Sequence, residues 1–431
     1  MSNQNSHPDL QTPIAFDGDH RHLFVGSGKG ASGHILHCNY YNNYLQRTIW
    51  YDAREFASGQ DILIGAGAEQ AYYGLSRLFA DLQLKDIAQK KHWASHFYSW
   101  QGLGALDFSS ITEKGGEIAT ASQHYAEGWR LQFGNASEPV GLLTQGWISG
   151  AASAIFGMPL GAFVPSQSKC AAVGPDLANV FRIVPGKASF PIYDGKAALQ
   201  LSAKREPVKI APNNIDEAAV MNAVFTLPLF GSPKVAGGLI KQFDVMISWL
   251  PHLYYDRVSF ECIHEGERRF GVDGREAVEV LLEEAGHRCA FRTFGGIWRS
   301  MEWAAVVEPM CKTREDWVHG MGAIANCAGW GRIECTRLTK DEAEFVVHDD
   351  YESVGYTALY GKAAFAPSYL LKGGFRGIMN LVYNGDIQSK PMLTEEYYNR
   401  LCQRPDAFVT DVVKSAAQGS PVSVFHVHRR G

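Results

Sequence analysis

Apolar residues recur at helical spacing in two long segments of the chain, 52–82 and 273–291. In the second segment Val278, Leu281 and Leu282 fall three and four residues apart, which places them on one face of a helix. Both segments are therefore predicted to be amphipathic helices that bury one face against the rest of the protein.

Shorter segments with the pattern of strands follow each predicted helix. In chain order these strands are 105–108, 117–121, 333–335 and 344–348. Hairpin turns are expected at 114–116 and 340–342, and a helix is expected to begin near Gly146 and again near Gly373. The order of helices, antiparallel hairpin and helix predicts an α+β fold in which helices pack on an antiparallel sheet.

The same pattern occurs twice because the chain contains an internal repeat. Residues 102–107, which begin Gly-Leu-Gly, recur as residues 329–334, which begin Gly-Trp-Gly, at an offset of 227 from Gly102 to Gly329. The same offset pairs Glu117 with Glu344, Gly128 with Gly355, and Gly146 with Gly373. An earlier block pairs Tyr40 and Tyr41 with Tyr254 and Tyr255 at an offset of 214, so the second copy carries about 13 additional residues.

The repeat sets the expected domain organisation. We expect a polar leader over 1–22, a first module over 23–195, a linker over 196–240 and a second module over 241–431. The linker is rich in proline, but its segment 220–230 is apolar and is expected to pack on one of the copies. His20 and His22, with Asp17 and Asp19, are expected to be solvated side chains of the leader rather than metal ligands.

Composition excludes several classes of protein. The net charge is −5 and the basic residues are scattered, which argues against a nucleic-acid partner. The sequence has no apolar run of about 18 residues and no signal-peptide pattern at its start, so we expect a cytoplasmic protein that does not cross a membrane. None of its eight cysteines forms a C-x-x-C pair, so we expect buried cysteines, no metal site and no cofactor.

A glycine-rich loop precedes the first copy. Gly28, Gly30 and Gly33 match G-x-G-x-x-G, and Asp52 follows about twenty residues later. The surrounding sequence lacks the alternating strands and helices of a dinucleotide-binding fold, and Gly30 stands where a P-loop needs serine or threonine. A flexible loop near a ligand site is the interpretation that the sequence favours.

The segment 34–47 carries the densest chemistry in the sequence, with two histidines, three asparagines and three tyrosines. His37 and Tyr40 are candidates for proton transfer, and Arg47 could bind a carboxylate at two points. Tyr41 and Tyr44 are candidate ligand-binding residues. The alternative is that the tyrosines line a seam between helix and sheet while the asparagines form caps and turns.

Further candidate ligand-binding residues come from elsewhere in the two copies. His96 and Trp100 lie one helical turn apart, although aromatic residues at that spacing are more often part of a core. The second copy offers Tyr254, Tyr255 and the aromatic residue Trp298.

The Gly-x-Gly strand, the hairpin and the Gly-x-x-x-Gly helix resemble the 4-vinyl reductase domain family, which belongs to a group of NO-signalling and Golgi-transport ligand-binding folds. Lys169, Cys170 and Gly174 before the apolar strand 178–184 are similar to the closing motif of that family. The resemblance implies a pocket for a small hydrophobic or aromatic molecule between helices and sheet. Phenol sensors of the family hold zinc with a glutamate where this chain has Gln167, so a zinc site is not expected here.

Two functions follow from these observations and stay open at the level of sequence. In the first, the protein is a cofactor-independent enzyme of aromatic-compound metabolism, such as a lyase or decarboxylase, in which His37 and Tyr40 move protons while Arg47 positions a carboxylate. In the second, it is a non-catalytic sensor, carrier or chaperone subunit. The expected partners are a small aromatic or hydrophobic molecule and a second copy of the chain in a homodimer.

Overall fold

The computed structural model describes residues 4–6, 13–27, 31–174, 178–202 and 207–431. A central antiparallel sheet joins the two copies. Its strands, in spatial order, are β1 (Gln4–Ser6), β2 (Pro13–Asp17), β3 (His22–Val25), β4 (Ser32–Cys38), β9 (Val245–Pro251) and β8 (Ile240–Gln242). Because β4 belongs to the first copy and β9 to the second, the pairing of these strands ties the copies together.

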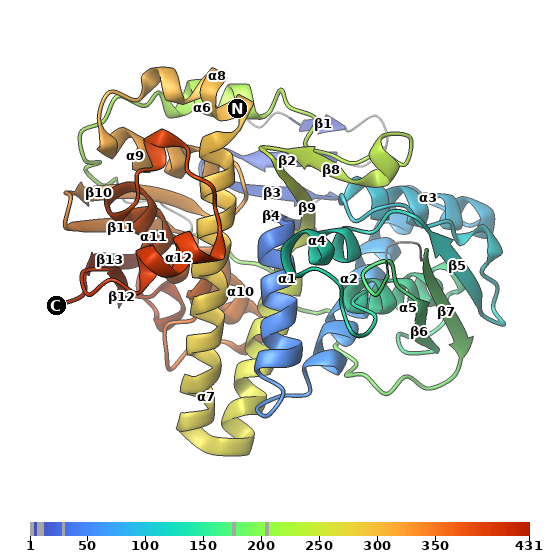
Figure 1. Cartoon of the computed structure of the whole chain (residues 1–431). Helices are drawn as coiled ribbons and strands as arrows, with labels where there is room; N and C mark the ends of the chain where they lie inside the picture. The colour runs from blue at the N-terminus through green and yellow to red at the C-terminus, as the bar shows by residue number, and fades with distance from the viewer. Residues whose placement is uncertain (1–3, 7–12, 28–30, 175–177, 203–206) are drawn as a thin grey trace.

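The first copy occupies the right half of Figure 1 and the second copy the left half. The first copy contains α1 (Asn39–Arg47), η2 (Thr48–Asp52), α2 (Gly59–Asp81), α3 (Ile87–Trp100), η3 (Phe108–Ser110), β5 (Gly116–Thr120), α4 (His124–Phe133), α5 (Leu142–Phe156), β6 (Phe163–Lys169) and β7 (Asn179–Pro185). Its own antiparallel sheet has the order β5-β7-β6.

The second copy repeats this order. It contains α7 (His252–Arg299), α8 (Met301–Val306), η5 (Glu308–Met310), α9 (Arg314–Ala325), β10 (Arg332–Leu338), β11 (Glu342–His348), α10 (Tyr351–Tyr360), α11 (Tyr369–Met379), η6 (Asn380–Asn384), η7 (Ile387–Ser389), α12 (Glu395–Cys402), β12 (Phe408–Lys414), η8 (Ala416–Gln418) and β13 (Ser423–Arg429). Its sheet has the order β10-β11-β13-β12, so β11, β13 and β12 correspond to β5, β7 and β6. The structure thus shows the predicted class, in which helices pack against antiparallel sheets.

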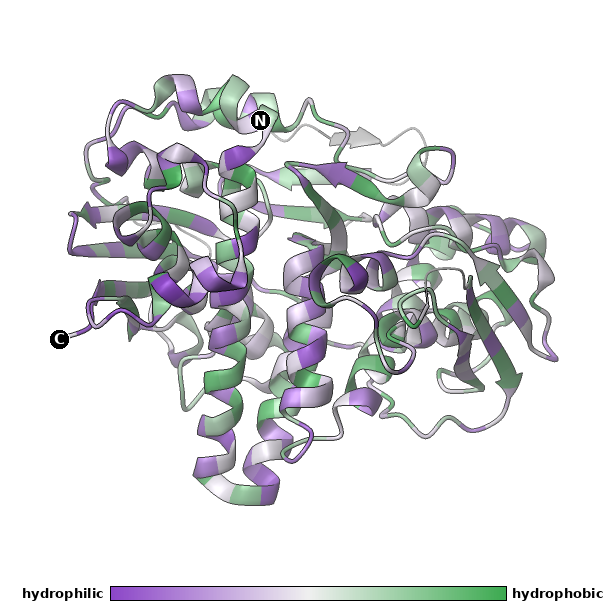
Figure 2. Ribbon diagram, in the orientation of Figure 1, coloured by the Kyte–Doolittle hydropathy of each residue, from purple (hydrophilic) through white to green (hydrophobic). Residues whose placement is uncertain are grey.

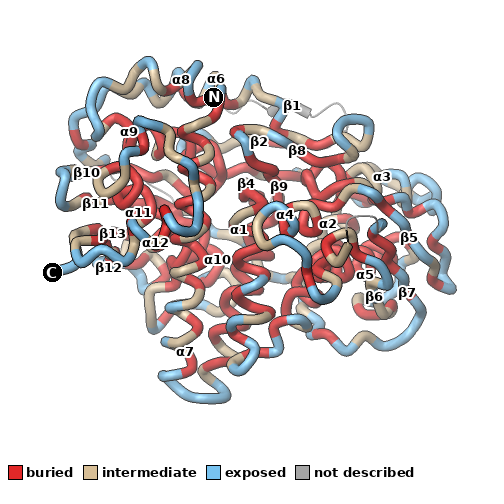
Figure 3. Tube along the Cα trace, viewed as in Figure 1, coloured by how far each residue is buried: buried red, intermediate tan, exposed pale blue. Residues whose placement is uncertain are grey.

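Helix α7 is a helical hairpin rather than one long helix. Gly271 breaks it with φ of 67°, and the two arms correspond to α1 and α2 of the first copy. The turn of this hairpin projects away from the rest of the molecule and is exposed (Figures 1 and 3). Away from this tip, a single hydrophobic cluster includes buried residues of both copies. Apolar and polar residues follow one another along the helices (Figure 2).

The two copies hold each other through reciprocal hydrogen bonds. The backbone N–H of Leu36 donates to the carbonyl oxygen of Ala328 at 2.8 Å, and the N–H of Trp249 donates to the carbonyl oxygen of Gln101 at 2.8 Å. Leu36 and Trp249 also face each other in the register of β4 and β9. An offset of 213, from Leu36 to Trp249, therefore relates the central strands, one less than the sequence comparison predicted.

Glycines at matching positions let helices cross closely in both copies. A Cβ atom on Gly146 of α5 would lie 2.0 Å from the carbonyl oxygen of Ile64 in α2, and a Cβ atom on Gly373 of α11 would lie 2.3 Å from the carbonyl oxygen of Glu283 in α7. No side chain fits at these distances, so the same glycine requirement shapes both helix pairs. An offset of 219, from Ile64 to Glu283, therefore relates α2 to the second arm of α7.

Most predicted elements are confirmed, but the predicted strand 105–108 is wrong. Strands β5, β10 and β11 and helices α2, α5, α7 and α11 overlap the predicted segments. In the first copy, however, the N–H of Gly104 bonds to Gly238 in the linker and the N–H of Ala105 bonds to Ser122. The backbone groups that would form the strand are therefore used elsewhere, and β5 pairs with β7 instead.

The described parts of the expected leader and linker belong to the folded body. Strand β2 and the beginning of β3 lie within 1–22, and the side chain of His22 is fully buried, so the expectation of a solvated leader is wrong. Ile14 and Val25, which face each other in the register of β2 and β3, are buried, as is Leu23. In the linker, the apolar segment is packed as expected, but on both copies: α6 (Glu217–Val224) packs on α9 of the second copy, and Phe230 stacks on Trp100 of the first. Within the described residues no helix is both long and apolar enough to span a bilayer.

Candidate functional site

Two pockets at equivalent positions flank the central strands. The first-copy pocket is a hollow of about 390 Å³ whose lining includes Ser32, His34, Gln70, Tyr73, Arg77 and Phe97. The second-copy cavity has about 50 Å³, and its lining includes Cys38, Val245, Ile247, Cys289, Thr293 and Ile324. The two linings correspond residue by residue. The offset between matching residues is 213 for the strands, 219 for the long helices and 227 for the helices that precede the Gly-x-Gly segments. These offsets pair Ser32 with Val245, His34 with Ile247, Gln70 with Cys289, Gly74 with Thr293, Phe97 with Ile324, and Pro251 with Cys38.

The first-copy pocket has a neutral histidine in its wall. His34 is buried, and its Nδ1 lies 3.0 Å from the carbonyl oxygen of Ser32, to which it donates its proton. Burial lowers the pKa of His34 to about 4, so the ring is neutral at pH 7 and Nε2 carries a free lone pair. Nε2 has no hydrogen-bond partner within the described residues. An unpaired buried acceptor costs about 1–3 kcal/mol, so this nitrogen favours a ligand or water that donates to it.

A cation and aromatic rings complete the first-copy pocket. The guanidinium of Arg77, on α2, has no ion pair within the parts of the chain that the structure describes, and Arg77 is partly buried. The carboxylate of Glu69, also in the lining, is already bound by Arg257 at 3.0 and 3.1 Å. Phe24, Tyr73 and Phe97 supply apolar walls. The described part of the pocket therefore combines a positive charge that has no carboxylate partner there with aromatic surface, a combination that suits an aromatic anion.

His37 lies on the other side of strand β4, in a cage of aromatic rings. Its ring centroid is 4.3 Å from that of Tyr41, 4.4 Å from Tyr255, 5.2 Å from Trp330 and 5.9 Å from Tyr351. Burial lowers its pKa well below the usual value, and neither ring nitrogen has a partner within the described residues. The cage thus brings together three of the residues that the sequence analysis selected, namely His37, Tyr41 and Tyr255.

A buried carboxyl that the sequence analysis did not select lies near this cage. Asp256 is one turn after His252 on α7, with 3.9 Å between Oδ2 and the Nδ1 of His252. Burial, followed by repulsion from Glu352 and Asp350, raises the pKa of Asp256 well above its usual value. Its oxygens have no hydrogen-bond partner among the described residues, and Gly355 gives them room, because a Cβ atom there would lie 1.7 Å from Oδ2. The pattern His-x-x-x-Asp at one helical turn was the available signal.

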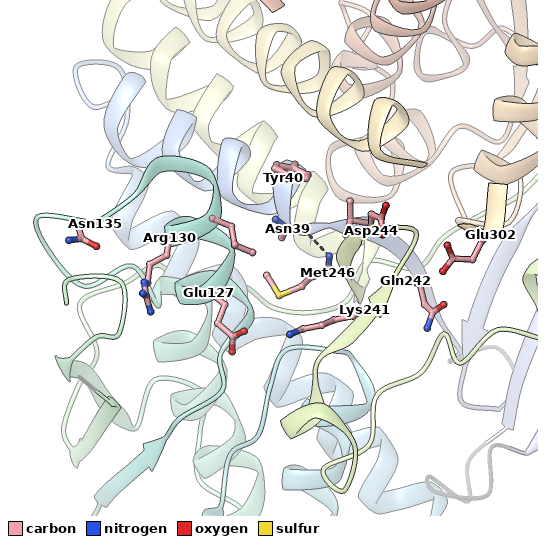
Figure 4. Close-up of a pocket in the computed structure, with 12 residues that line it drawn as sticks. Asn39, Tyr40, Glu127, Arg130, Asn135, Lys241, Gln242, Asp244, Met246 and Glu302 are labelled. Atoms are coloured by element: carbon pink, nitrogen blue, oxygen red, sulfur yellow. Dashed lines mark hydrogen bonds between the residues drawn. The ribbon is translucent and has the colours of Figure 1, made fainter. Parts of the chain in front are cut away.

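A hollow larger than either of these pockets is an outer groove of about 760 Å³ between α4 and the β8–β9 hairpin (Figure 4). Its charged side chains have both signs, with Arg130 and Lys241 opposed by Glu127, Asp244 and Glu302. Several polar groups there already serve the fold. Asn39 Oδ1 accepts from the N–H of Met246, and Glu302 accepts from the N–H of Phe243. We therefore regard the first-copy pocket, which has unsatisfied groups, as the better ligand site.

The structure separates the three residues proposed for catalysis. His37 lines the second-copy cavity, Tyr40 lines the outer groove, and Arg47 has a side chain that is 46% exposed. Arg47 lies 4.0 Å from Asp52 and over the ring of Phe133, so the prediction that it shares a site with His37 is not supported by its position. Tyr40 and Arg47 are seven residues apart and lie on one face of α1, whereas His37 precedes this helix on β4.

The remaining candidate ligand-binding residues fall into separate packing clusters. Tyr44 packs on Phe133, Trp100 stacks on Phe97 and Phe230, and Trp298 packs on Trp303 and Trp317. His96 contacts His92 and Trp93 on the outer side of α3. Tyr254 is buried and its ring packs on Tyr255. Trp100 lies directly beneath the first-copy pocket because it packs on both His34 and Phe97.

Sequence reasoning missed Arg77, Gln70 and Tyr73, which line the first-copy pocket from α2. They lie within the segment 52–82, where only the helical period was informative. The glycine-rich loop was expected near a ligand site, and Ser32 and Gly33, which follow it, line this pocket. Gly28 and Gly30 themselves lie outside the described residues.

Comparisons with known proteins add a distant likeness. No family model matches the chain, and no curated protein matches it. Among solved structures, the chain is similar to the phenol-responsive sensory domain of the transcription activator PoxR, determined with phenol. The TM-score is 0.28 and the identity 11%, over 40% of this chain and 74% of that domain. A likeness at this level carries no argument about function, which rests on the geometry of the pockets.

Proposed function

We propose that this chain binds a small aromatic carboxylate in the first-copy pocket and that its two copies are modules of the 4-vinyl reductase type. The observation that carries the proposal is the guanidinium of Arg77, which has no ion pair among the described residues and lies in a lining that also contains aromatic rings. A volume of about 390 Å³ lies within the range typical of small-molecule sites, roughly 300–1,000 Å³.

Each part of the ligand has a counterpart in the lining. The carboxylate pairs with Arg77, because an arginine offers two parallel N–H donors to a carboxylate. The ring packs on Phe97 and Tyr73. A hydroxyl on the ring donates to the free lone pair of His34 Nε2, which is buried in the wall of the pocket and is reached when that wall moves. A phenolic acid satisfies all three contacts, whereas phenol lacks the group that Arg77 binds.

Isothermal titration calorimetry with 4-hydroxybenzoate, benzoate and phenol tests this function. We expect 4-hydroxybenzoate to bind most tightly, and Arg77→Gln to weaken binding of both acids about 10–100-fold, equivalent to about 1.5–3 kcal/mol for a charge-assisted contact. The same variant leaves phenol binding unchanged. Arg54→Gln is the matched control, since the Arg54 side chain is 70% exposed and lies in neither pocket. Equal affinity of the acids for wild type and Arg77→Gln would overturn the proposal.

Native mass spectrometry distinguishes a binding protein from an enzyme. If the released compound has the mass of the compound added, the chain is a carrier or sensor subunit. A changed mass identifies a cofactor-independent reaction, and the mass difference names the group lost, for example carbon dioxide from a decarboxylated acid.

A further inference from the structure

Three positions of the second-copy cavity carry two thiols and a hydroxyl, whereas the matching positions of the first-copy pocket carry neither group. Cys38, Cys289 and Thr293 occupy the positions that Pro251, Gln70 and Gly74 occupy in the first copy. Because the same backbone arrangement forms without these groups, the fold does not require them. Apart from His37 and a third cysteine, Cys327, the rest of the lining is apolar, so the chemistry of the cavity comes from these few groups.

Cys38 is placed to be a nucleophile. It is the last residue of β4 and the N-cap of α1, a nine-residue helix. Burial by itself raises the pKa of the Cys38 thiol, but hydrogen bonds from Cys289, Thr293 and the backbone N–H groups of Tyr41 and Tyr40 together lower it below the usual value. A helix N-terminus favours a thiolate in this way.

Cys289 is the second thiol. It lies one turn before Thr293 on α7, and its sulfur is 3.3 Å from Thr293 Oγ1, while the sulfur of Cys38 is 2.7 Å from the same oxygen. The two sulfurs are therefore no more than 6.0 Å apart. Burial, followed by the neighbouring Cys38, raises the pKa of Cys289 well above its usual value. One sulfur thus favours the thiolate and the other the thiol, as an attacking and a resolving cysteine require.

The cavity limits what can reach the two thiols. A volume of about 50 Å³ holds a few water-sized molecules, since each needs roughly 10–15 Å³, and it is smaller than the roughly 150 Å³ of a cavity that binds benzene. A small neutral oxidant such as hydrogen peroxide fits this space.

We propose that Cys38 and Cys289 form a peroxide-reactive thiol pair in the second-copy cavity. The Cys38 thiolate attacks one oxygen of hydrogen peroxide, the O–O bond breaks, and the leaving hydroxide takes a proton to become water. Cys38 is oxidised to a sulfenic acid and the peroxide is reduced. The Cys289 thiol then attacks the Cys38 sulfur, loses its proton and displaces hydroxide, which leaves as a second water. The product is a Cys38–Cys289 disulfide, which needs the sulfurs to approach to about 2.05 Å.

The test uses the full chain, fully reduced and treated with hydrogen peroxide in the folded state. After the peroxide is removed, the chain is unfolded in the presence of N-ethylmaleimide to block remaining thiols, because reagents of this size do not enter a cavity of about 50 Å³. Intact-mass measurement and peptide mapping should show the loss of two hydrogens and a disulfide that links the peptides of Cys38 and Cys289. In Cys289→Ser the sulfenic acid of Cys38 persists and is trapped when dimedone is present during unfolding. Thr293→Val should slow the oxidation of Cys38 about tenfold, because loss of the hydroxyl that stabilises the thiolate raises its pKa by about one unit.

Cys327→Ser is the matched control, because Cys327 lines the same cavity and burial raises its pKa to about 12. This variant should form the disulfide as fast as wild type. Circular dichroism and binding of 4-hydroxybenzoate verify that each variant is folded, since that ligand is proposed for the other pocket. Oxidation of Cys38 no faster than that of Cys262 or Cys327, or a disulfide that joins other cysteines, would overturn the inference.

Discussion

The two pockets show how one backbone arrangement supports two kinds of chemistry. In the first-copy pocket the equivalent positions hold Gln70 and Gly74, beside Arg77 and a neutral His34, in a hollow of about 390 Å³. In the second-copy cavity the same positions hold Cys289 and Thr293, and apolar side chains reduce the space to about 50 Å³. The lining of a pocket can therefore diverge while the crossing of the helices and the register of the strands stay fixed.

The difference also shows which groups belong to the fold. Glycines at the helix crossings are kept in both copies because backbone atoms occupy the space that a side chain would need. The polar and thiol groups of the linings have no such requirement. A group that the fold does not need, and that is left without a partner in one copy, indicates a ligand or a reaction.

The largest expected effect tests whether the helix crossing of the first copy needs glycine. Gly146→Ala places a Cβ atom 2.0 Å from the backbone oxygen of Ile64, which cannot move without separating α2 and α5. We expect a loss of about 3 kcal/mol in the free energy of unfolding, measured by urea denaturation. Gly374→Ala in α11 is the control, because nothing lies within 4 Å of a Cβ atom there. It should be neutral or slightly stabilising, and equal losses in the two variants would contradict the close crossing.

The neutral state of His34 predicts a dependence of stability on pH. Its folded pKa of about 4 lies below the usual value of 6.5, so between these values the unfolded chain binds more protons and stability falls as pH falls. His34→Gln removes this effect. Between pH 7.5 and pH 4.5 the variant should lose about 2–3 kcal/mol less than wild type, measured by thermal unfolding.

A contrasting variant checks the sign. Burial by itself lowers the pKa of His20, but the hydrogen bonds that its ring donates to the Asp17 carboxylate and the Ser202 carbonyl oxygen, together with the charge of Asp17, raise it overall, so the native state binds the additional proton. Stability from His20 is present at low pH and is lost as pH rises. His20→Gln should therefore change the pH dependence in the opposite direction, and by less, since His20 is partly exposed.

The raised pKa of Asp256 predicts a further dependence of stability on pH. Its folded pKa is raised well above that of the unfolded chain, so the native state keeps a proton that the unfolded chain releases, and stability falls as pH rises above about 4. Asp256→Asn carries no titratable group at this position, so it lacks this pH dependence. As pH rises above about 4, the unfolding free energy of wild type should fall relative to that of the variant, and the difference between the two should grow with pH in urea denaturation. A constant difference would show that the carboxyl is ionised in the native protein.

Much of the fold could be predicted because local patterns encode it. The helical spacing of Val278, Leu281 and Leu282 predicts an amphipathic helix whatever its neighbours, and α7 contains that segment. The repeat of Gly-x-Gly predicted two copies of one arrangement. The pattern failed at 105–108, where the linker rather than a neighbouring strand takes the backbone hydrogen bonds, a contact between residues far apart in the chain.

The chemistry of segment 34–47 was visible in the sequence, but its division among sites was not. The sequence by itself determined that His34, His37, Tyr40 and Tyr41 lie close together in the chain. Tertiary structure decided that β4 presents His34 to one pocket and His37 to the other, because residues 34 and 37 point to opposite faces of the strand. It also brought Cys289 beside Cys38 and Arg77 beside His34. These residues come from helices that the periodicity located, but only packing fixes which face of a helix meets which strand.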